Sequence, residues 1–129
     1  MKSRCGYTLV ELLVVLLVMG AMTSLALPLY LSGARNSRHQ TANANAKSIA
    51  QAVQSLYIRA GGSAYNASSI DSTTLAVELG GQIPVNPCTA GTDLATDFGL
   101  QLTATGATIK PAAGDKCTAA QLPEIRLGS

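Results

Sequence analysis

The apolar run from Tyr7 to Leu31 constrains this chain more than any other feature. It carries one ionisable side chain, Glu11, and lacks the polar face of a core helix in a soluble protein. As a helix rising about 1.5 Å per residue, the run would be roughly 37 Å long, enough to cross the hydrocarbon core of a membrane. Lys2 and Arg4 precede it, so we expect the N-terminus in the cytoplasm and the rest of the chain outside.

A secretory signal peptide would begin in a similar way, with basic residues before an apolar segment. Two observations argue against it. Glu11 is unusual near the start of such a segment, and the far end, ALPLYLSGAR, has no convincing small-residue cleavage pattern. The sequence therefore favours a membrane segment that stays with the protein.

The start of the chain follows a fixed pattern: a basic leader, Gly6, an aromatic residue, Thr, Leu, an aliphatic residue, Glu11, and a long apolar run containing Pro28. This pattern resembles the class III signal of type IV pilins and pseudopilins. The resemblance implies cleavage between Gly6 and Tyr7 by prepilin peptidase, N-methylation of Tyr7, and assembly roles for Glu11 and Pro28. Phe is usual at the new terminus, so Tyr7 is a mild departure. The match covers the first quarter of the chain.

The cysteines suggest a disulfide bond in the exported part of the chain. Cys5 would leave with the leader, so Cys88 and Cys117 remain as an even pair where disulfides form and persist. A small domain with few aromatic residues benefits from such a bridge. A zinc site needs about four ligands, and only His39 could join these two cysteines. We therefore expect a disulfide, no metal and no cofactor, with His39 solvated or at headgroup level.

Basic residues are concentrated in one part of the sequence. Between Glu11 and Asp71 there is no acid, and this interval holds Arg35, Arg38, Lys47 and Arg59. Most acids follow it, so a basic stalk carries an acidic head. Two interpretations of Arg35 and Arg38 stay open: contact with lipid headgroups, or contact with the acidic face of a neighbouring subunit.

We expect one helix from Tyr7 to about Ala60, interrupted at Pro28. A proline inside a helix leaves the Ser24 carbonyl without its backbone partner, so a kink is expected there. Ser and Thr hydroxyls can compensate for the lost bond. The family resemblance implies instead that this segment unwinds when subunits pack into a fibre, and the two expectations are compatible.

Residues 32–61 are predicted to form the amphipathic half of this helix, which Gly61 and Gly62 end. Apolar side chains recur there at helical spacing and should carry the head. They are Ala42, Ala46, Ile49, Val53, Leu56, Tyr57 and Ala60.

Residues 62–129 are expected to form a globular head. Its parts are a connecting region over 62–96, a short helix TTLAVEL capped by Asp71 or Ser72, and a hairpin that alternates from Phe98 and turns at TATG. LPEIRL is expected to add an edge strand before the C-terminal tail. The chain is thus predicted to be α+β, with a leader (1–6), a transmembrane and assembly helix (7–31), and a spine packed on a small antiparallel sheet. The pilin resemblance makes 62–96 the αβ-loop and Cys88–Cys117 the D-region.

The sequence leaves three classes of function to distinguish: a structural subunit, a nucleic-acid binder and an enzyme. The favoured one is a structural subunit of a type IV pilus, held in the inner membrane with a cytoplasmic N-terminus and then assembled into a surface filament that serves motility, adhesion or DNA uptake. Its implied partners are other pilins, prepilin peptidase, membrane lipid before assembly, and an inner-membrane platform driven by a cytoplasmic ATPase. Alternatives are a type II secretion pseudopilin and a DNA-binding minor pilin of a competence pilus.

The remaining two classes have less support. An acidic head with few aromatic residues argues against direct nucleic-acid binding, which needs exposed Lys and Arg. The sequence contains no phosphate-binding glycine loop, metal motif or Ser/His/Asp grouping, which argues against an enzyme.

Overall fold

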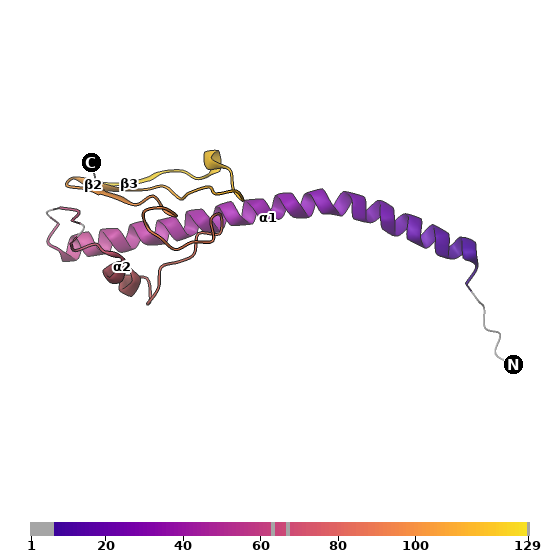
Figure 1. The fold of residues 1–129 in the computed structure, drawn as a ribbon, viewed down its shortest axis with the longest axis horizontal. Coiled ribbons are helices and arrows are strands. Elements are labelled where there is room, and N and C mark those ends of the chain that lie inside the picture. Colours follow the sequence, from indigo (N-terminus) through magenta and orange to yellow (C-terminus); the bar gives the residue numbers. More distant parts are fainter. Residues whose placement is uncertain (1–6, 63, 67, 129) are drawn as a thin grey trace. The chain divides into compact units, whose positions relative to one another are not determined.

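The computed structural model describes residues 7–62, 64–66 and 68–128 (Figure 1). The chain divides into two compact units, Met1–Ala34 and Arg35–Ser129. One long helix and a small antiparallel sheet confirm the predicted α+β class. The elements are α1 (Leu9–Arg59), α2 (Ser72–Glu78), β1 (Gln101–Thr103), β2 (Gly106–Ile109), the short 3₁₀ helix η1 (Ala119–Gln121) and β3 (Ile125–Leu127).

Helix α1 ends at the predicted glycine pair. Gly61 and Gly62 have φ angles of 88° and 69°, a conformation that residues with a Cβ rarely adopt. The Gly62 N–H donates to the Tyr57 carbonyl oxygen at 3.0 Å, which satisfies one of the last carbonyls of the helix. The Tyr57 hydroxyl in turn donates to the Gly62 carbonyl oxygen, so the chain turns back at this point.

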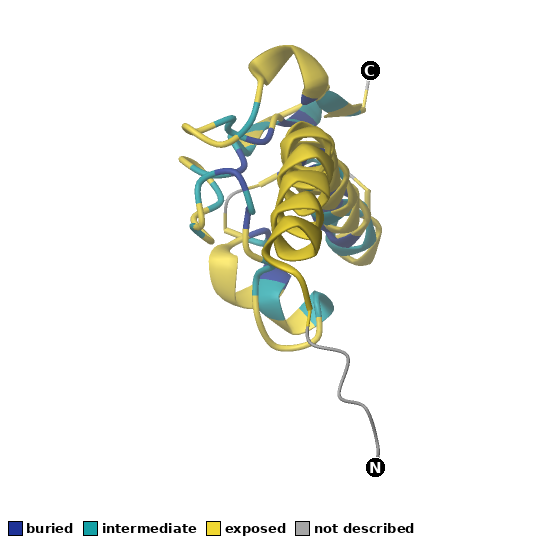
Figure 2. Cartoon of the chain, turned by 90° about the vertical axis from the view of Figure 1, so that its right-hand side faces the viewer, coloured by how far each residue is buried: buried dark blue, intermediate teal, exposed yellow. Residues whose placement is uncertain are grey.

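The buried face of α1 forms the centre of the head. Ala42, Ala46, Ile49 and Val53 are buried as predicted, whereas Leu56 and Tyr57 are half-buried. Two further alanines, Ala50 and Ala52, are buried as well. This wider face has a cause in the fold: within the second unit, the sheet and α2 lie on opposite sides of α1 (Figures 1 and 2). The core includes Leu75 of α2 and Ile109 of β2.

The stripe along α1 ends earlier than predicted. Ala60 is exposed, and α1 ends one residue before it, at Arg59. The last apolar contacts of the helix with the head core come from the half-buried Leu56 and Tyr57. The Tyr57 ring stacks on buried Tyr65 of the following loop, with ring centroids 4.2 Å apart.

The three strands form a sheet in the order β1-β2-β3, and both pairs are antiparallel. Side chains alternate along β2, where Ala107 and Ile109 are buried. The predicted turn at TATG is present, and the Thr103 hydroxyl donates to the Gly106 carbonyl oxygen at 2.9 Å. LPEIRL supplies the edge strand β3, as expected.

The prediction that the first strand alternates from Phe98 was wrong. Strand β1 begins only at Gln101, and Phe98 is fully buried in the loop before it. Gly99 interrupts the extended backbone with a φ of 55°, and a Cβ at this position would lie 2.7 Å from the Lys110 carbonyl oxygen. The Leu100 N–H donates to the Leu94 carbonyl oxygen instead of joining a strand pair.

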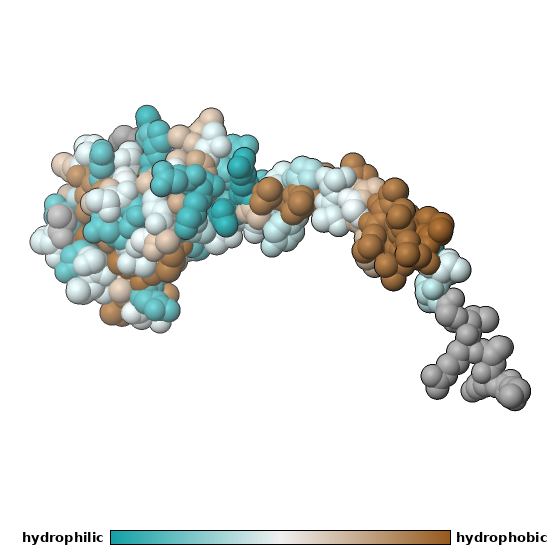
Figure 3. Space-filling view, turned by 45° about the vertical axis from the view of Figure 1, so that its right-hand side comes forward, coloured by the Kyte–Doolittle hydropathy of each residue, from teal (hydrophilic) through white to brown (hydrophobic). Residues whose placement is uncertain are grey.

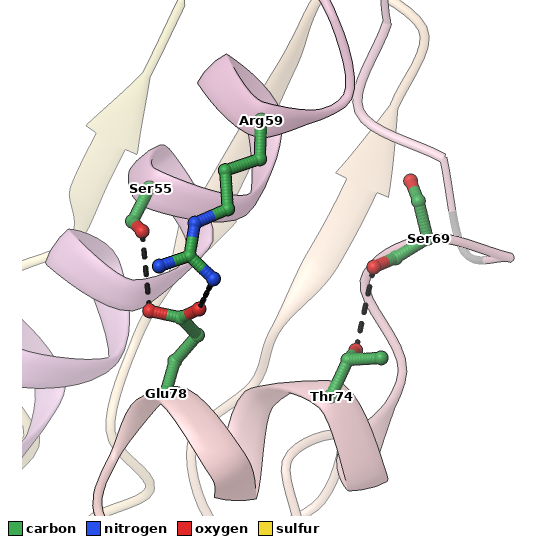
Figure 4. A network of polar contacts seen from close by, with 5 residues as sticks. All are labelled: Ser55, Arg59, Ser69, Thr74 and Glu78. Atoms are coloured by element: carbon green, nitrogen blue, oxygen red, sulfur yellow. Dashed lines mark hydrogen bonds and ion pairs between the residues drawn. The ribbon is translucent and has the colours of Figure 1, made fainter.

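Helix α2 is attached to the end of α1 by a small polar network (Figure 4). Asp71 caps the helix, and its carboxylate accepts hydrogen bonds from the backbone N–H groups of Thr73 and Thr74 at 3.0 and 2.8 Å. At the other end, Glu78 accepts a hydrogen bond from the Ser55 hydroxyl at 3.2 Å and forms an ion pair with Arg59.

Candidate assembly segment

The N-terminal part of α1 exposes apolar side chains on all sides. Every described residue from Tyr7 to Gly33 is exposed, and Leu9 retains 80% of its surface. Figure 3 shows the hydrophobic surface that these side chains form. Among the described residues, α1 is the one helix long and apolar enough to cross a membrane. Apolar surface of this extent must be covered by lipid or by other protein chains.

Glu11 lies in the first turn of α1, where its backbone has a local partner. The Glu11 N–H donates to the hydroxyl oxygen of Thr8 at 3.3 Å, and Thr8 directly precedes the helix. This is the contact of an N-cap, and Thr8-Leu9-Val10-Glu11 has the residue pattern of a capping box. The pattern was readable in the sequence and was missed there. Thr8 also explains why the helix begins at Leu9 instead of Tyr7.

Pro28 lies inside α1, and the helix continues through it. Hydroxyl groups of Thr23, Ser24 and Ser32 each donate to a helix carbonyl three or four residues earlier, at 2.7 to 2.9 Å. The acceptors are the carbonyls of Met19, Ala21 and Leu29. Among the described residues, no hydroxyl compensates at the Ser24 carbonyl, although we had expected one to do so. That carbonyl is the point of weakness that the proline creates.

Tyr7, the expected N-methylated residue, lies before α1 and keeps 76% of its surface exposed. Gly6 and the rest of the expected leader lie outside the described residues. Cleavage and methylation therefore stay predictions, as do the assembly roles of Glu11 and Pro28.

His39 was predicted to be solvated or at headgroup level, and this was wrong. It is only 5% exposed, and its Nδ1 has no hydrogen-bond partner among the described residues. The reason is its position on the helix: His39 precedes buried Ala42 and Ala46 at helical spacing, so the buried stripe begins one turn earlier than the apolar residues indicate. The head covers α1 from this turn onward.

The expected disulfide joins Cys88 to Cys117, with Cα atoms 5.4 Å apart. Cys88 is buried against Ala42 of α1 and against Leu122 of the C-terminal tail. The bridge therefore links a loop, the tail and the helix in one apolar cluster.

Asn86 is fully buried and was missed in the sequence. Its side-chain amide donates to the carbonyl oxygens of Asp97 and Ala112 at 2.6 and 3.0 Å, and its Oδ1 accepts from the Cys88 N–H at 3.0 Å. Three segments of the head are thus hydrogen-bonded to one side chain. No local pattern could have identified it, because two of the three partners are distant in the sequence.

Two carboxylates of the head are held in their charged form by hydrogen bonds. Backbone and hydroxyl donors of Thr74 and Thr73 lower the pKa of Asp71 from its usual 3.8. Donors of Thr96 and Ala95 do the same for the pKa of Asp93. Both groups cap turns or helices, and neither faces a reacting partner. In the described part of the chain, no three His, Cys, Asp or Glu side chains gather to hold a metal ion.

Comparison with known protein families identifies the start of the chain. The prokaryotic N-terminal methylation motif matches residues 1–27, which is the class III signal of type IV pilins and pseudopilins. No curated protein and no solved structure matches this chain. The motif supports a pilin-like or pseudopilin protein, a structural class and not an enzyme. It also implies processing by prepilin peptidase and assembly with other pilins.

Proposed function

We propose that this pilin-like chain is a structural subunit of a type IV pilus filament. The observation that carries the proposal is the combination of the methylation motif with a helix whose N-terminal part is apolar and exposed on every side. Such a surface is covered by lipid before assembly. In a filament, it is covered by the same segment of neighbouring subunits, while the disulfide-bonded heads form the outside.

Assembly of this kind needs an external source of work. Lipid tails already shield the apolar side chains, so moving α1 from the membrane into a fibre core gains little hydrophobic free energy. A cytoplasmic ATPase acting through an inner-membrane platform is the proposed motor. The weak point at Ser24 and Pro28 is the proposed place where the helix unwinds during packing.

Glu11 is the proposed determinant of register between subunits. A carboxylate in an apolar environment is costly unless it is paired. Cleavage after Gly6 would create an amine at Tyr7, and pairing that amine with Glu11 of an adjacent subunit would neutralise both charges. Any other axial offset between neighbouring subunits would leave Glu11 among aliphatic side chains. The pair would also be absent from the precursor, which prevents premature assembly.

Two substitutions separate this pairing from a capping-box role of the Glu11 side chain. Glu11→Val removes the charge and the capping-box side chain. Glu11→Gln removes only the charge, because Gln also serves at this position of a capping box. We expect both variants to reach the membrane in normal amounts and to form few or no filaments. Filaments counted by electron microscopy, beside immunoblots of the membrane fraction, provide the measurement.

Gly6→Val, which blocks cleavage, is the control for a chain that reaches the membrane without assembling. Normal filament numbers for Glu11→Gln as the sole copy would show that Glu11 acts only as a cap and would refute the pairing. If the wild-type protein is not the dominant band in sheared filaments, it is not the main subunit.

A further inference from the structure

An open cavity of about 340 Å³ lies within the second unit, between α1 and the disulfide-closed segment of the head. Its lining residues are Arg35, Arg38, Asp115, Lys116, Cys117 and Thr118. The sequence placed Arg35 and Arg38 near the membrane, and the fold adds a third cation, Lys116, from a segment far along the chain. All three cations are exposed to solvent.

The positive charge of this surface is not neutralised within the head. Among the described residues, the ion pairs are Arg59–Glu78 and Arg126–Glu124, so none of the three cations has a carboxylate partner. Asp115 is the one acid in the lining, against three bases. The surface therefore carries a net positive charge, although most acids of the chain belong to this same head.

The position of Lys116 is fixed by the disulfide and by a tight turn. Lys116 directly precedes Cys117, which is bonded to buried Cys88. Gly114 begins the turn with a φ of 54°, and a Cβ there would lie 2.5 Å from the Cys88 carbonyl oxygen. The turn is thus packed closely against Cys88, which holds the Lys116 backbone beside the cavity.

Chain length places this surface near the membrane, however the two units are arranged. Arg35 follows Leu31, the last residue of the apolar run, by four residues, which reach at most about 14 Å when fully extended. Along a helix, as α1 is here, the rise is about 6 Å. A headgroup layer is roughly 5 to 8 Å thick outside the hydrocarbon core. Tyr30, exposed at the end of the run, is a residue type enriched at that interface.

We propose that Arg35, Arg38 and Lys116 form a single contact surface for anionic phospholipid headgroups on the outer face of the membrane. The two arginines bind lipid phosphates with their planar guanidinium groups, and Lys116 adds a point charge from the head. The disulfide thereby orients the head against the bilayer before assembly. This inference rests on the membrane-anchored stage of the proposed function, not on the filament.

The test uses the full chain as single copies in nanodiscs that contain equal amounts of phosphatidylglycerol and phosphatidylcholine. Lys2→Gln and Arg4→Gln are present throughout, because these two bases would contact headgroups of the opposite leaflet. The triple variant Arg35→Gln, Arg38→Gln and Lys116→Gln is compared with a control of equal charge change, which replaces Lys47, Lys110 and Arg126 by Gln. The control positions are exposed and do not line the cavity.

Native mass spectrometry then counts the lipids retained on the protein. We expect the ratio of phosphatidylglycerol to phosphatidylcholine to fall about fivefold or more in the triple variant, since each cation contributes up to roughly fivefold, and to stay near the unsubstituted value in the control. Hydrogen exchange of residues 114–118 should be slower in nanodiscs with phosphatidylglycerol than in pure phosphatidylcholine. This difference should disappear in the triple variant.

Equal lipid ratios for the triple variant and the control would overturn the proposal. Slow exchange caused by inorganic phosphate alone in phosphatidylcholine nanodiscs would overturn it as well, because a free anion would then be the ligand. If the triple variant keeps its lipid ratio and, in a separate sample of vesicles that hold many copies, loses cross-links between copies, the surface belongs to a neighbouring subunit instead. The nanodisc test needs no filament. Its outcome is therefore independent of whether the Glu11 variants assemble.

Discussion

At the scale of single residues, Asn86 has the most concentrated set of contacts in the head. One buried side chain satisfies two carbonyl oxygens and one N–H group, which come from three separate stretches of backbone. A buried polar group that loses its partner costs more than a hydrogen bond contributes when it is formed. Asn86 therefore has a larger influence on stability than its small size suggests.

Asn86→Ala should lower the free energy of unfolding by about 3 kcal/mol, because Asp97, Ala112 and Cys88 each lose a partner. Asn36→Ala, at an exposed position of α1, is the matched control and should change stability little. Thermal unfolding of the full chain in detergent, followed by near-ultraviolet circular dichroism, reports on the stacked tyrosines. Equal melting temperatures for the two variants would show that water replaces the Asn86 contacts.

At the scale of elements, α2 depends on one carboxylate. This helix is only 7 residues long, too short to be stable by itself. Asp71 closes its first turn, and Thr74 completes the capping box by accepting from the Asp71 N–H at 3.1 Å. The apolar side of α2 contributes buried Leu75 to the core. Loss of the cap should therefore loosen α2 before it affects the sheet.

The lowered pKa of Asp71 predicts how stability depends on pH. Because its pKa is lower in the folded than in the unfolded chain, the unfolded state binds the extra proton first as pH falls. The stabilisation by the Asp71 carboxylate is complete above pH 3.8, the ordinary pKa of this group. It is lost as pH falls through the lower pKa of the folded chain. Asp71→Asn keeps the capping oxygen without the charge, and Asp71→Ala removes both.

We expect Asp71→Ala to melt a few degrees below wild type at pH 7, with Asp71→Asn in between. The difference between wild type and Asp71→Asn should shrink toward zero in a series of melts from pH 7 to pH 2. A difference that stays constant over this range would mean that the charge has no part in the cap.

At the scale of the whole molecule, the two units are stabilised by different means. In the first unit, every described residue before Ala34 is exposed, so this part of the helix packs against no core of its own. The second unit has its own core, together with a disulfide between residues 29 positions apart in the sequence. A small head of this kind should lose much of its stability without the bridge.

Replacing Cys88 and Cys117 together by Ala should lower the free energy of unfolding by about 2–5 kcal/mol. Cys5→Ser is added to all samples so that position 5 cannot form bridges between chains. Unfolding in guanidinium chloride, with and without dithiothreitol, gives the measurement. The reductant should lower the stability of the Cys5→Ser parent to that of the variant and leave the variant unchanged. If dithiothreitol leaves the stability of the parent unchanged, even when it is added to the unfolded protein, the bridge does not form.

The sequence by itself determined the features that depend on neighbouring residues. An apolar run long enough for a membrane, the end of α1 before Gly61, the cap at Asp71 and the turn before Gly106 all follow from local composition and spacing. The class III signal is also local, since the pattern from the basic leader to Glu11 occupies adjacent positions. In each case the physical cause acts within a few residues, so no knowledge of the fold was needed.

Only the tertiary structure decided which polar residues are buried. His39 looked solvated because imidazole is polar, but the head covers the turn of α1 that carries it. Asn86 finds carbonyl partners 11 and 26 positions away, and Lys116 lines the same cavity as Arg35 and Arg38, which lie far from it in the sequence. These contacts depend on which distant segments fold against the helix, and a one-dimensional pattern does not contain that information.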